Sequence, residues 1–157
     1  MNISIRKGLS LLLFFAVPLL VNAGAEKNTE KKKTVIKRNV DPRVYSRGQK
    51  LYLKNCAQCH GRFAEGDANW RQPGKDGKYP PPPLNGTAHT WHHSPRALIT
   101  VIQNGTGKIG GNMPAWKDRL TVKQISDILV WITAQWPDEI YTVWYNNFIS
   151  KKSPETE

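Results

Sequence analysis

The chain carries both of its cysteines and one of its four histidines in a single stretch, Cys56-Ala-Gln-Cys59-His60. Two thiols three residues apart, followed directly by an imidazole, have three uses in proteins. They can form a redox-active dithiol, contribute part of a zinc site, or attach a haem group covalently. The rest of the sequence separates these alternatives.

Context disfavours the first two uses. A thioredoxin-like dithiol lies where a strand turns into a helix, but here the pair follows a predicted helix and no strand pattern occurs. A structural zinc ion needs four ligands. His89, His92 and His93 could complete a Cys2His2 set in number, but their spacing matches no zinc finger.

Haem attachment accounts for the spacing of the motif. Thiols at Cys56 and Cys59 on one helical turn can each add to one vinyl group of a haem, and the next residue then directs its imidazole at the iron from the same side. The sequence therefore predicts one covalently bound haem c. Cys56 and Cys59 are the expected thioether anchors, and His60 is an expected iron ligand.

The second axial ligand is predicted by elimination. The chain has two methionines, and Met1 is expected to be removed with the N-terminal segment. Met113 lies in the glycine-rich stretch "GGNMPAW" rather than on an apolar helical face, where methionine usually fills a core. We predict Met113 as the axial ligand, which would raise the reduction potential. The alternatives are His89, His92 and His93.

Helix signals flank this motif on both sides. Aspartate or serine followed by proline opens two predicted helices, a capping threonine opens a third, and an apolar spacing of four residues predicts a last, short one. The segment between the motif and the second helix is rich in glycine and proline and suits neither a helix nor a central strand. The predicted helices cover residues 41–58, 94–105, 121–136 and 137–148.

The N-terminus has the composition of a secretory signal peptide. Arg6 and Lys7 precede an apolar run from Leu9 to Val21, and small residues allow cleavage after Ala23 or Ala25. An uncleaved anchor is the alternative, but the run is shorter than the roughly 20 residues that span a bilayer. We expect residues 1–23 to direct export to the periplasm and residues 24–40 to form a flexible lysine-rich leader. No stable membrane insertion is expected after cleavage.

Charge constrains the partners. The formal net charge of +11 becomes +9 when Arg6 and Lys7 are removed. Such an excess could suit nucleic acid, but export and the lack of an aromatic-interleaved basic motif argue against it. We expect redox protein partners that dock through an acidic surface, with a merely solvated basic exterior as the alternative.

Together these features resemble the class I monohaem c-type cytochromes over residues 41–136. The corresponding stretches are "GQKLYLKNCAQCH", "PPPLNG", "GNMPAW" and "TVKQISDILVWITAQW". The resemblance implies an all-α, cytochrome c-like fold, with three to five short helices and long loops wrapped around one covalently bound haem. Residues 137–157 depart from the simplest members. We expect them to form a helical extension and tail that packs on the domain, or else a partner-docking face.

The resemblance also implies roles for residues outside the motif. Gly48 and Tyr52 should form the close crossing with the last helix of the domain, around Ile128 and Trp131. Pro82 should offer its carbonyl to the Nδ1–H of the ligand histidine and fix the orientation of its ring.

Two further residues are candidates for the haem periphery. Trp91, in "AHTWHH", and Arg71, in "NWRQPG", could hydrogen-bond a haem propionate. The alternative is that both are exposed loop residues.

The leading functional prediction is a periplasmic carrier of single electrons, because two protein ligands leave no open position on the iron. Such a carrier is not itself an enzyme. The first alternative is a haem c subunit of a periplasmic oxidoreductase complex. The second is a gas sensor or peroxidase in which Met113 is labile.

Overall fold

The computed structural model describes residues 35–150, and this part of the chain is helical with no strand, as the sequence predicts. The expected signal peptide lies outside the described residues, as does the leader before residue 35. None of the helices in residues 35–150 is long and apolar enough to cross a membrane. In chain order the helices are α1 (Pro42–Asn55), α2 (Ala57–His60), η1 (Thr90–His92), α3 (Pro95–Asn104), η2 (Gly107–Ile109), α4 (Val122–Ala134) and α5 (Asp138–Phe148).

The residues that predicted the helix starts cap them in the structure. The Asp41 carboxylate accepts a hydrogen bond of 2.8 Å from a backbone N–H in the first turn of α1. The Ser94 hydroxyl accepts one of 3.2 Å at the start of α3. Thr121 and Gln124 form a reciprocal capping box on α4. Each of these contacts satisfies N–H groups that have no partner within their own helix.

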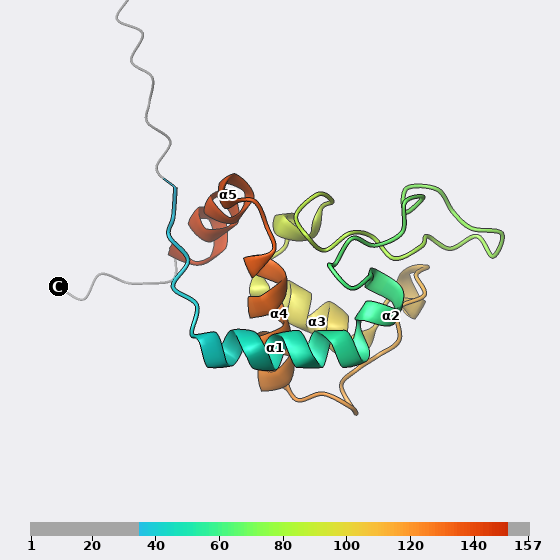
Figure 1. Ribbon diagram of the computed structural model, residues 1–157. Helices are drawn as coiled ribbons and strands as arrows, with labels where there is room; N and C mark the ends of the chain where they lie inside the picture. Colours follow the sequence, from blue (N-terminus) through green and yellow to red (C-terminus); the bar gives the residue numbers. More distant parts are fainter. Residues whose placement is uncertain (1–34, 151–157) are drawn as a thin grey trace, which may run out of the picture. The chain divides into compact units, whose positions relative to one another are not determined.

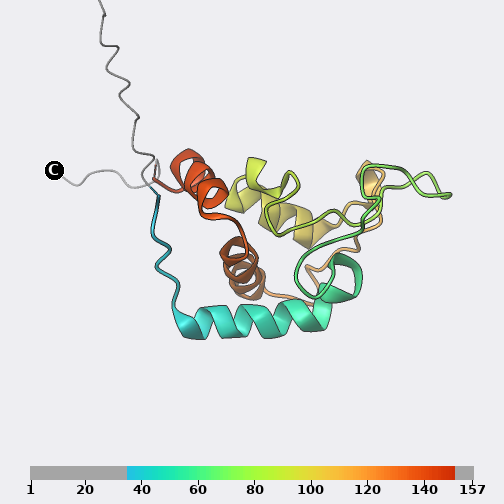
Figure 2. The same cartoon turned by 45° about the horizontal axis from the view of Figure 1, so that its top comes forward.

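The core lies where α1 crosses α4, low in Figure 1 and in the tilted view of Figure 2. Gly48 is buried at this crossing, and a Cβ there would overlap the carbonyl oxygen of Asp127 and lie 3.2 Å from the Cβ of Trp131. The rings of Tyr52 and Trp131 pack with their centroids 4.2 Å apart. The predicted crossing is therefore confirmed: glycine lets the two backbones approach, and the aromatic rings fill the space beside it.

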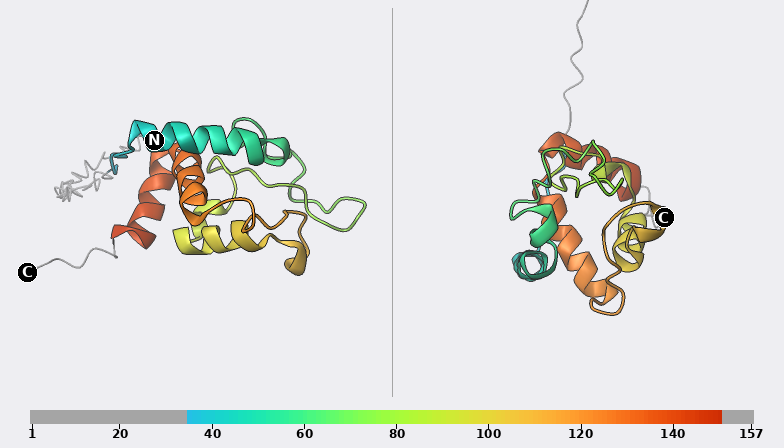
Figure 3. Two further views of the ribbon diagram at one scale, coloured as in Figure 1. Left: turned by 90° about the horizontal axis from the view of Figure 1, so that it is seen from below. Right: turned by 90° about the vertical axis from the view of Figure 1, so that its right-hand side faces the viewer.

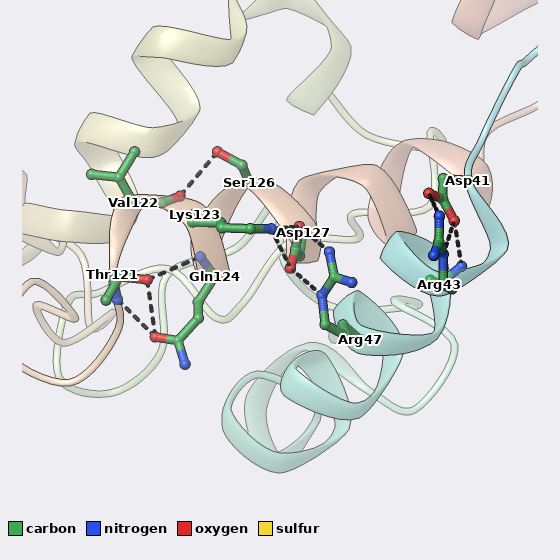
Figure 4. Close-up of polar contacts among 9 residues, drawn as sticks. All are labelled: Asp41, Arg43, Arg47, Thr121, Val122, Lys123, Gln124, Ser126 and Asp127. Atoms are coloured by element: carbon green, nitrogen blue, oxygen red, sulfur yellow. Dashed lines mark hydrogen bonds and ion pairs between the residues drawn. The ribbon is translucent and has the colours of Figure 1, made fainter.

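A buried carboxylate, which the sequence analysis did not single out, also joins these two helices. The Asp127 side chain, on α4, is only 8% exposed. It accepts a hydrogen bond of 2.9 Å from Nε of Arg47 on α1 and one of 3.2 Å from Nζ of Lys123 on its own helix (Figure 4). These bonds hold the pKa of Asp127 below its usual value, with the bond to Arg47 the largest cause.

The other long helices are arranged around α4. Figure 3, left, shows α1 and α3 on opposite sides, with α4 running from one toward the other. The side chains that fill the core come mainly from α4 and from the segments on either side of it. The largest fully buried side chains of this core are Tyr52, Ile125, Ile128 and Trp136.

The last part of the leader differs from the predicted flexible segment, because residues 35–40 contact α5. The backbone N–H of Ile36 donates a 3.0 Å hydrogen bond to Oγ1 of Thr142. The Arg38 guanidinium lies 3.1 Å from the Asp138 carboxylate and is 19% exposed. Contacts with α5 order these residues, which their own composition would leave flexible.

The predicted C-terminal helix forms as α5 and packs on the domain. Trp144 is buried, with its ring edge-on to that of Trp136 at a centroid distance of 5.3 Å. Its indole N–H donates a 2.8 Å hydrogen bond to the carbonyl oxygen of His93. The apolar face of α5 is thus occupied inside the molecule, and only its outer face could meet a partner.

Candidate haem-binding site

The Cys-x-x-Cys-His motif occupies the turn that follows α1. Cys56 ends α1, and its carbonyl oxygen accepts hydrogen bonds from the N–H groups of Cys59, at 3.2 Å, and His60, at 2.9 Å. Both thiols therefore project from one helical turn. Neither forms a disulfide; Cys56 is half-buried and Cys59 is exposed.

The structure argues against the two other uses of this motif. Burial, with a smaller effect from Cys59, raises the pKa of Cys56 to about 11. A reactive dithiol needs a thiolate of lowered pKa, so the Cys56 thiol is poorly suited to redox exchange. Within residues 35–150, no three His, Cys, Asp or Glu side chains are grouped so that they could hold a metal ion. A Cys2His2 zinc site therefore has no support there.

The two ring nitrogens of His60 have different surroundings. Nδ1 lies 3.1 Å from the carbonyl oxygen of Pro82, the residue that the resemblance indicates. With this carbonyl as its partner, Nδ1 carries the proton, which leaves the Nε2 lone pair available to a metal. Burial lowers the pKa of His60, against a smaller opposing effect of the Pro82 carbonyl. The ring is therefore neutral near pH 7, the form that ligates metals.

The proline-rich segment is held in place by the turn after the motif. The N–H groups of Leu84 and Asn85 both bond to the carbonyl oxygen of Ala64, at 2.8 and 3.1 Å. The N–H of Asp67 bonds to the carbonyl oxygen of Pro81 at 2.9 Å. Consecutive prolines have fixed φ angles and no N–H donors. This stretch therefore presents its carbonyl oxygens from a stiff backbone.

Met113 lies in the loop between α3 and α4, and its backbone is fixed from both sides. Its N–H donates to Oγ1 of Thr106, and its carbonyl oxygen accepts from the N–H of Thr106, each at 2.9 Å. Gly105 is folded against the segment from Met113 to Ala115, so closely that a Cβ would collide with its backbone. The Met113 side chain is half-buried.

Only one of the two predicted peripheral residues lies beside Pro82. A pocket of about 360 Å³ is bounded by Arg71 and Pro82. Trp91 does not line it; instead, Trp91 stacks on His92 with a centroid distance of 3.7 Å and packs against the core. The other residues that line the pocket are Trp70, Tyr79, Pro80 and His89.

Sequence reasoning missed Trp70 and Tyr79 as members of this site. The Arg71 guanidinium lies over the Trp70 ring, 4.3 Å from its centroid, and the Trp70 and His89 rings are 5.6 Å apart. The sequence did contain a signal for them. Both are aromatic residues in a loop otherwise rich in glycine, proline and charge, and aromatic side chains need an apolar surface to cover.

These side chains fit a covalently attached haem. Cys56 and Cys59 offer two thiols from one turn. His60 offers Nε2 from a ring already oriented by a carbonyl, and Met113 offers a thioether from a fixed loop. Arg71 adds a cation at the edge of a pocket that is mostly apolar.

A helix that ends in Cys-x-x-Cys-His, crossed by a later helix and followed by a methionine loop, defines a c-type cytochrome. The chain belongs to the family described as "Cytochrome C oxidase, cbb3-type, subunit III", which matches residues 43–132. The predicted class and fold are therefore confirmed.

Two curated relatives carry the description "Cbb3-type cytochrome c oxidase subunit CcoP". The protein from Azospirillum brasilense is 32% identical over 97 residues, which cover 61% of this chain and 30% of the relative. The protein from Azospirillum sp. (strain B510) is 32% identical over 87 residues, which cover 55% and 27%. The chain thus spans less than a third of the length of these relatives.

Proposed function

We propose that this protein is the haem c electron-transfer subunit of a periplasmic oxidoreductase complex, of the oxidase kind. The observation that carries the proposal is the match of residues 43–132 to an oxidase subunit family, over the part of the chain that forms the motif and the α1–α4 crossing. This match favours the subunit role over the free carrier that the sequence alone placed first.

In this proposal, Cys56 and Cys59 would hold one haem through thioether bonds, and His60 and Met113 would be the ligands of its iron. When bound, the haem supplies a single reversible electron step between Fe(III) and Fe(II). The protein's own contribution would be to supply both iron ligands from its side chains, exclude water and set the reduction potential. It transfers electrons and catalyses no reaction of its own.

Three further residues have proposed supporting roles. The Pro82 carbonyl holds the ring of His60 in one orientation, as their 3.1 Å contact supports. The Arg71 guanidinium neutralises a propionate at the pocket edge, where Trp70 supports it from below. Trp91, packed away from that pocket, is the weaker candidate for a propionate contact.

The proposal includes a location and a mode of encounter. Residues 1–23 would direct export and be cleaved, which places the domain in the periplasm. The formal net charge of +9 that remains after the loss of Arg6 and Lys7 would steer the domain toward acidic surfaces on redox partners, in a salt-dependent manner.

Native purification tests the subunit role. We expect the wild-type chain to co-elute with oxidase subunits on gel filtration and to keep its haem after denaturation. A Cys56→Ser/Cys59→Ser double variant should lose the covalent haem. A wild-type chain that keeps its haem but elutes alone, at the mass of a monomer, would remove the subunit role.

That last outcome would support the second candidate, a free electron carrier. The high net positive charge favours this candidate, because transient carriers find their partners by long-range attraction. A free carrier should reduce or oxidise an acidic partner at a rate that falls steeply with added salt. A stable subunit should show little dependence on salt once assembled.

A further inference from the structure

We propose that Tyr52 is a positioning residue for His60: its hydroxyl holds the backbone that carries this histidine and so sets how the ring meets Pro82. The inference rests on the proposed function, in which His60 is a haem ligand. Its effect is on the properties of that ligand rather than on whether haem is present.

Contacts at both ends of the Tyr52 side chain support this role. Its ring is fully buried and packs against Trp131. Its hydroxyl donates a 2.8 Å hydrogen bond to the carbonyl oxygen of Gly61 and lies 3.3 Å from that of His60. One side chain thus joins the α1–α4 crossing to the end of α2.

From this end of α2, hydrogen bonds lead back to the ring of His60. The His60 carbonyl oxygen also accepts a 2.8 Å hydrogen bond from the N–H of Gly66. Two residues before Gly66, the Ala64 carbonyl oxygen accepts from Leu84, at 2.8 Å. Leu84 is two residues beyond Pro82, whose carbonyl meets Nδ1 of His60. Hydrogen bonds and short stretches of backbone therefore connect the main chain of His60 back to its own ring. Tyr52 joins this set of contacts to the core.

Replacement of Tyr52 by phenylalanine isolates the hydroxyl. The ring would still pack on Trp131, but the carbonyl oxygens of His60 and Gly61 would lose a buried donor. Each of these oxygens would keep one backbone donor, the N–H of Gly66 for His60 and the N–H of Ala64 for Gly61. The turn would lose the hydrogen bonds that join it to the core, and a turn held less firmly would loosen the Nδ1–Pro82 bond. A looser bond makes the imidazole a less basic ligand and shifts the redox equilibrium toward the reduced form.

The test compares the holoproteins of wild type, Tyr52→Phe and Tyr45→Phe. Tyr45 is the matched control, because it is also on α1 and, within residues 35–150, its hydroxyl hydrogen-bonds only to Gln135, at 3.5 Å. Two quantities are measured: solvent exchange of the His60 Nδ1 proton by NMR of the reduced protein, and the midpoint potential. We expect Tyr52→Phe to exchange roughly tenfold faster and to be roughly threefold more reduced at a fixed ambient potential. Tyr45→Phe should change neither.

Thermal unfolding separates positioning from ordinary stability. If Tyr52→Phe lowers the melting temperature but matches Tyr45→Phe in exchange and potential, Tyr52 is only a structural residue and the inference is wrong. If the wild-type chain carries no covalent haem, the proposed function fails instead. The absorption spectrum shows this before any variant is compared.

Discussion

Among the proposed iron ligands, Met113 depends most on how its side chain is held, because a thioether is a weak ligand that needs a fixed position. The loop around it is built for such presentation: Thr106 holds both backbone groups of Met113, and Gly105 lies against the chain just beyond it. The structure therefore supplies a fixed backbone where the sequence shows only glycines and one methionine.

We predict that Met113→Leu removes the weak far-red sulfur-to-iron absorption band of the oxidised protein and lowers the reduction potential, because thioether ligation favours Fe(II). Optical spectroscopy and redox titration measure both effects. His92→Ala is the control, since this exposed histidine is an alternative ligand. A wild-type protein without this band, together with a reduction potential that changes in His92→Ala but not in Met113→Leu, would reverse the ligand assignment.

At the scale of elements, the crossing of α1 and α4 positions the motif, because α1 ends directly at Cys56. The crossing rests on one glycine, one aromatic pair and one buried carboxylate. A change in any of these would shift the end of α1 and, with it, Cys56, Cys59 and His60.

Gly48→Ala should destabilise the protein by about 3 kcal/mol, because the added methyl group would collide with the backbone of α4 and force the helices apart. Chemical denaturation of the holoprotein measures the loss. Gly107→Ala is the control, since no atom lies within 4 Å of a Cβ at that position. Equal stability of the two variants would show that the helices do not approach as closely as the structure indicates.

Asp127→Asn should lower the free energy of unfolding by about 2 kcal/mol near pH 7, because it removes the charged group that accepts hydrogen bonds from Arg47 and Lys123. The pKa of Asp127 is lowered in the folded protein from an ordinary 3.8. Its ionised form therefore stabilises the fold fully above that pH, and the contribution disappears as the pH falls through the folded value. The wild type should lose this stability in acid, whereas Asp127→Asn should not.

Urea unfolding at a series of pH values measures this difference. Asp118→Asn, which replaces an exposed carboxylate, is the control and should behave like the wild type. A stability difference between wild type and Asp127→Asn that stays constant down to pH 2 would contradict the linkage.

At the scale of the whole described domain, α5 and residues 35–40 close the side away from the motif (Figure 1). Arg38 makes most of this closure: it hydrogen-bonds the carbonyl oxygen of Trp136, pairs with Asp138 and lies over the Tyr141 ring at 4.6 Å. The domain is thus completed by two segments that the family match of residues 43–132 does not include.

Arg38→Ala should lower the free energy of unfolding by about 1 kcal/mol, mostly through loss of the bond to Trp136, because Asp138 is 60% exposed and its ion pair is solvated. Hydrogen exchange should show faster opening of α5 with no change at α2. Lys37→Ala, an exposed neighbour, is the control. An unchanged exchange rate in α5 would mean that Arg38 does not hold it.

The sequence by itself determined the parts that depend on neighbouring residues. Asp41, Ser94 and Thr121 mark helix starts because capping is local. The Cys-x-x-Cys-His spacing predicts one helical turn with two thiols on it, and this predicted turn forms. The domain class followed from these signals together with the order of the motifs.

Tertiary structure alone decided the contacts between distant residues. Nothing local to Tyr52 indicates that its hydroxyl reaches Gly61, nothing near Asp127 indicates Arg47 as its partner, and nothing in the lysine-rich leader indicates that Arg38 lies on α5. Each contact depends on how helices cross and where loops return, and those positions follow from burial summed over the whole core. Local sequence determines which elements form; packing determines which side chains meet.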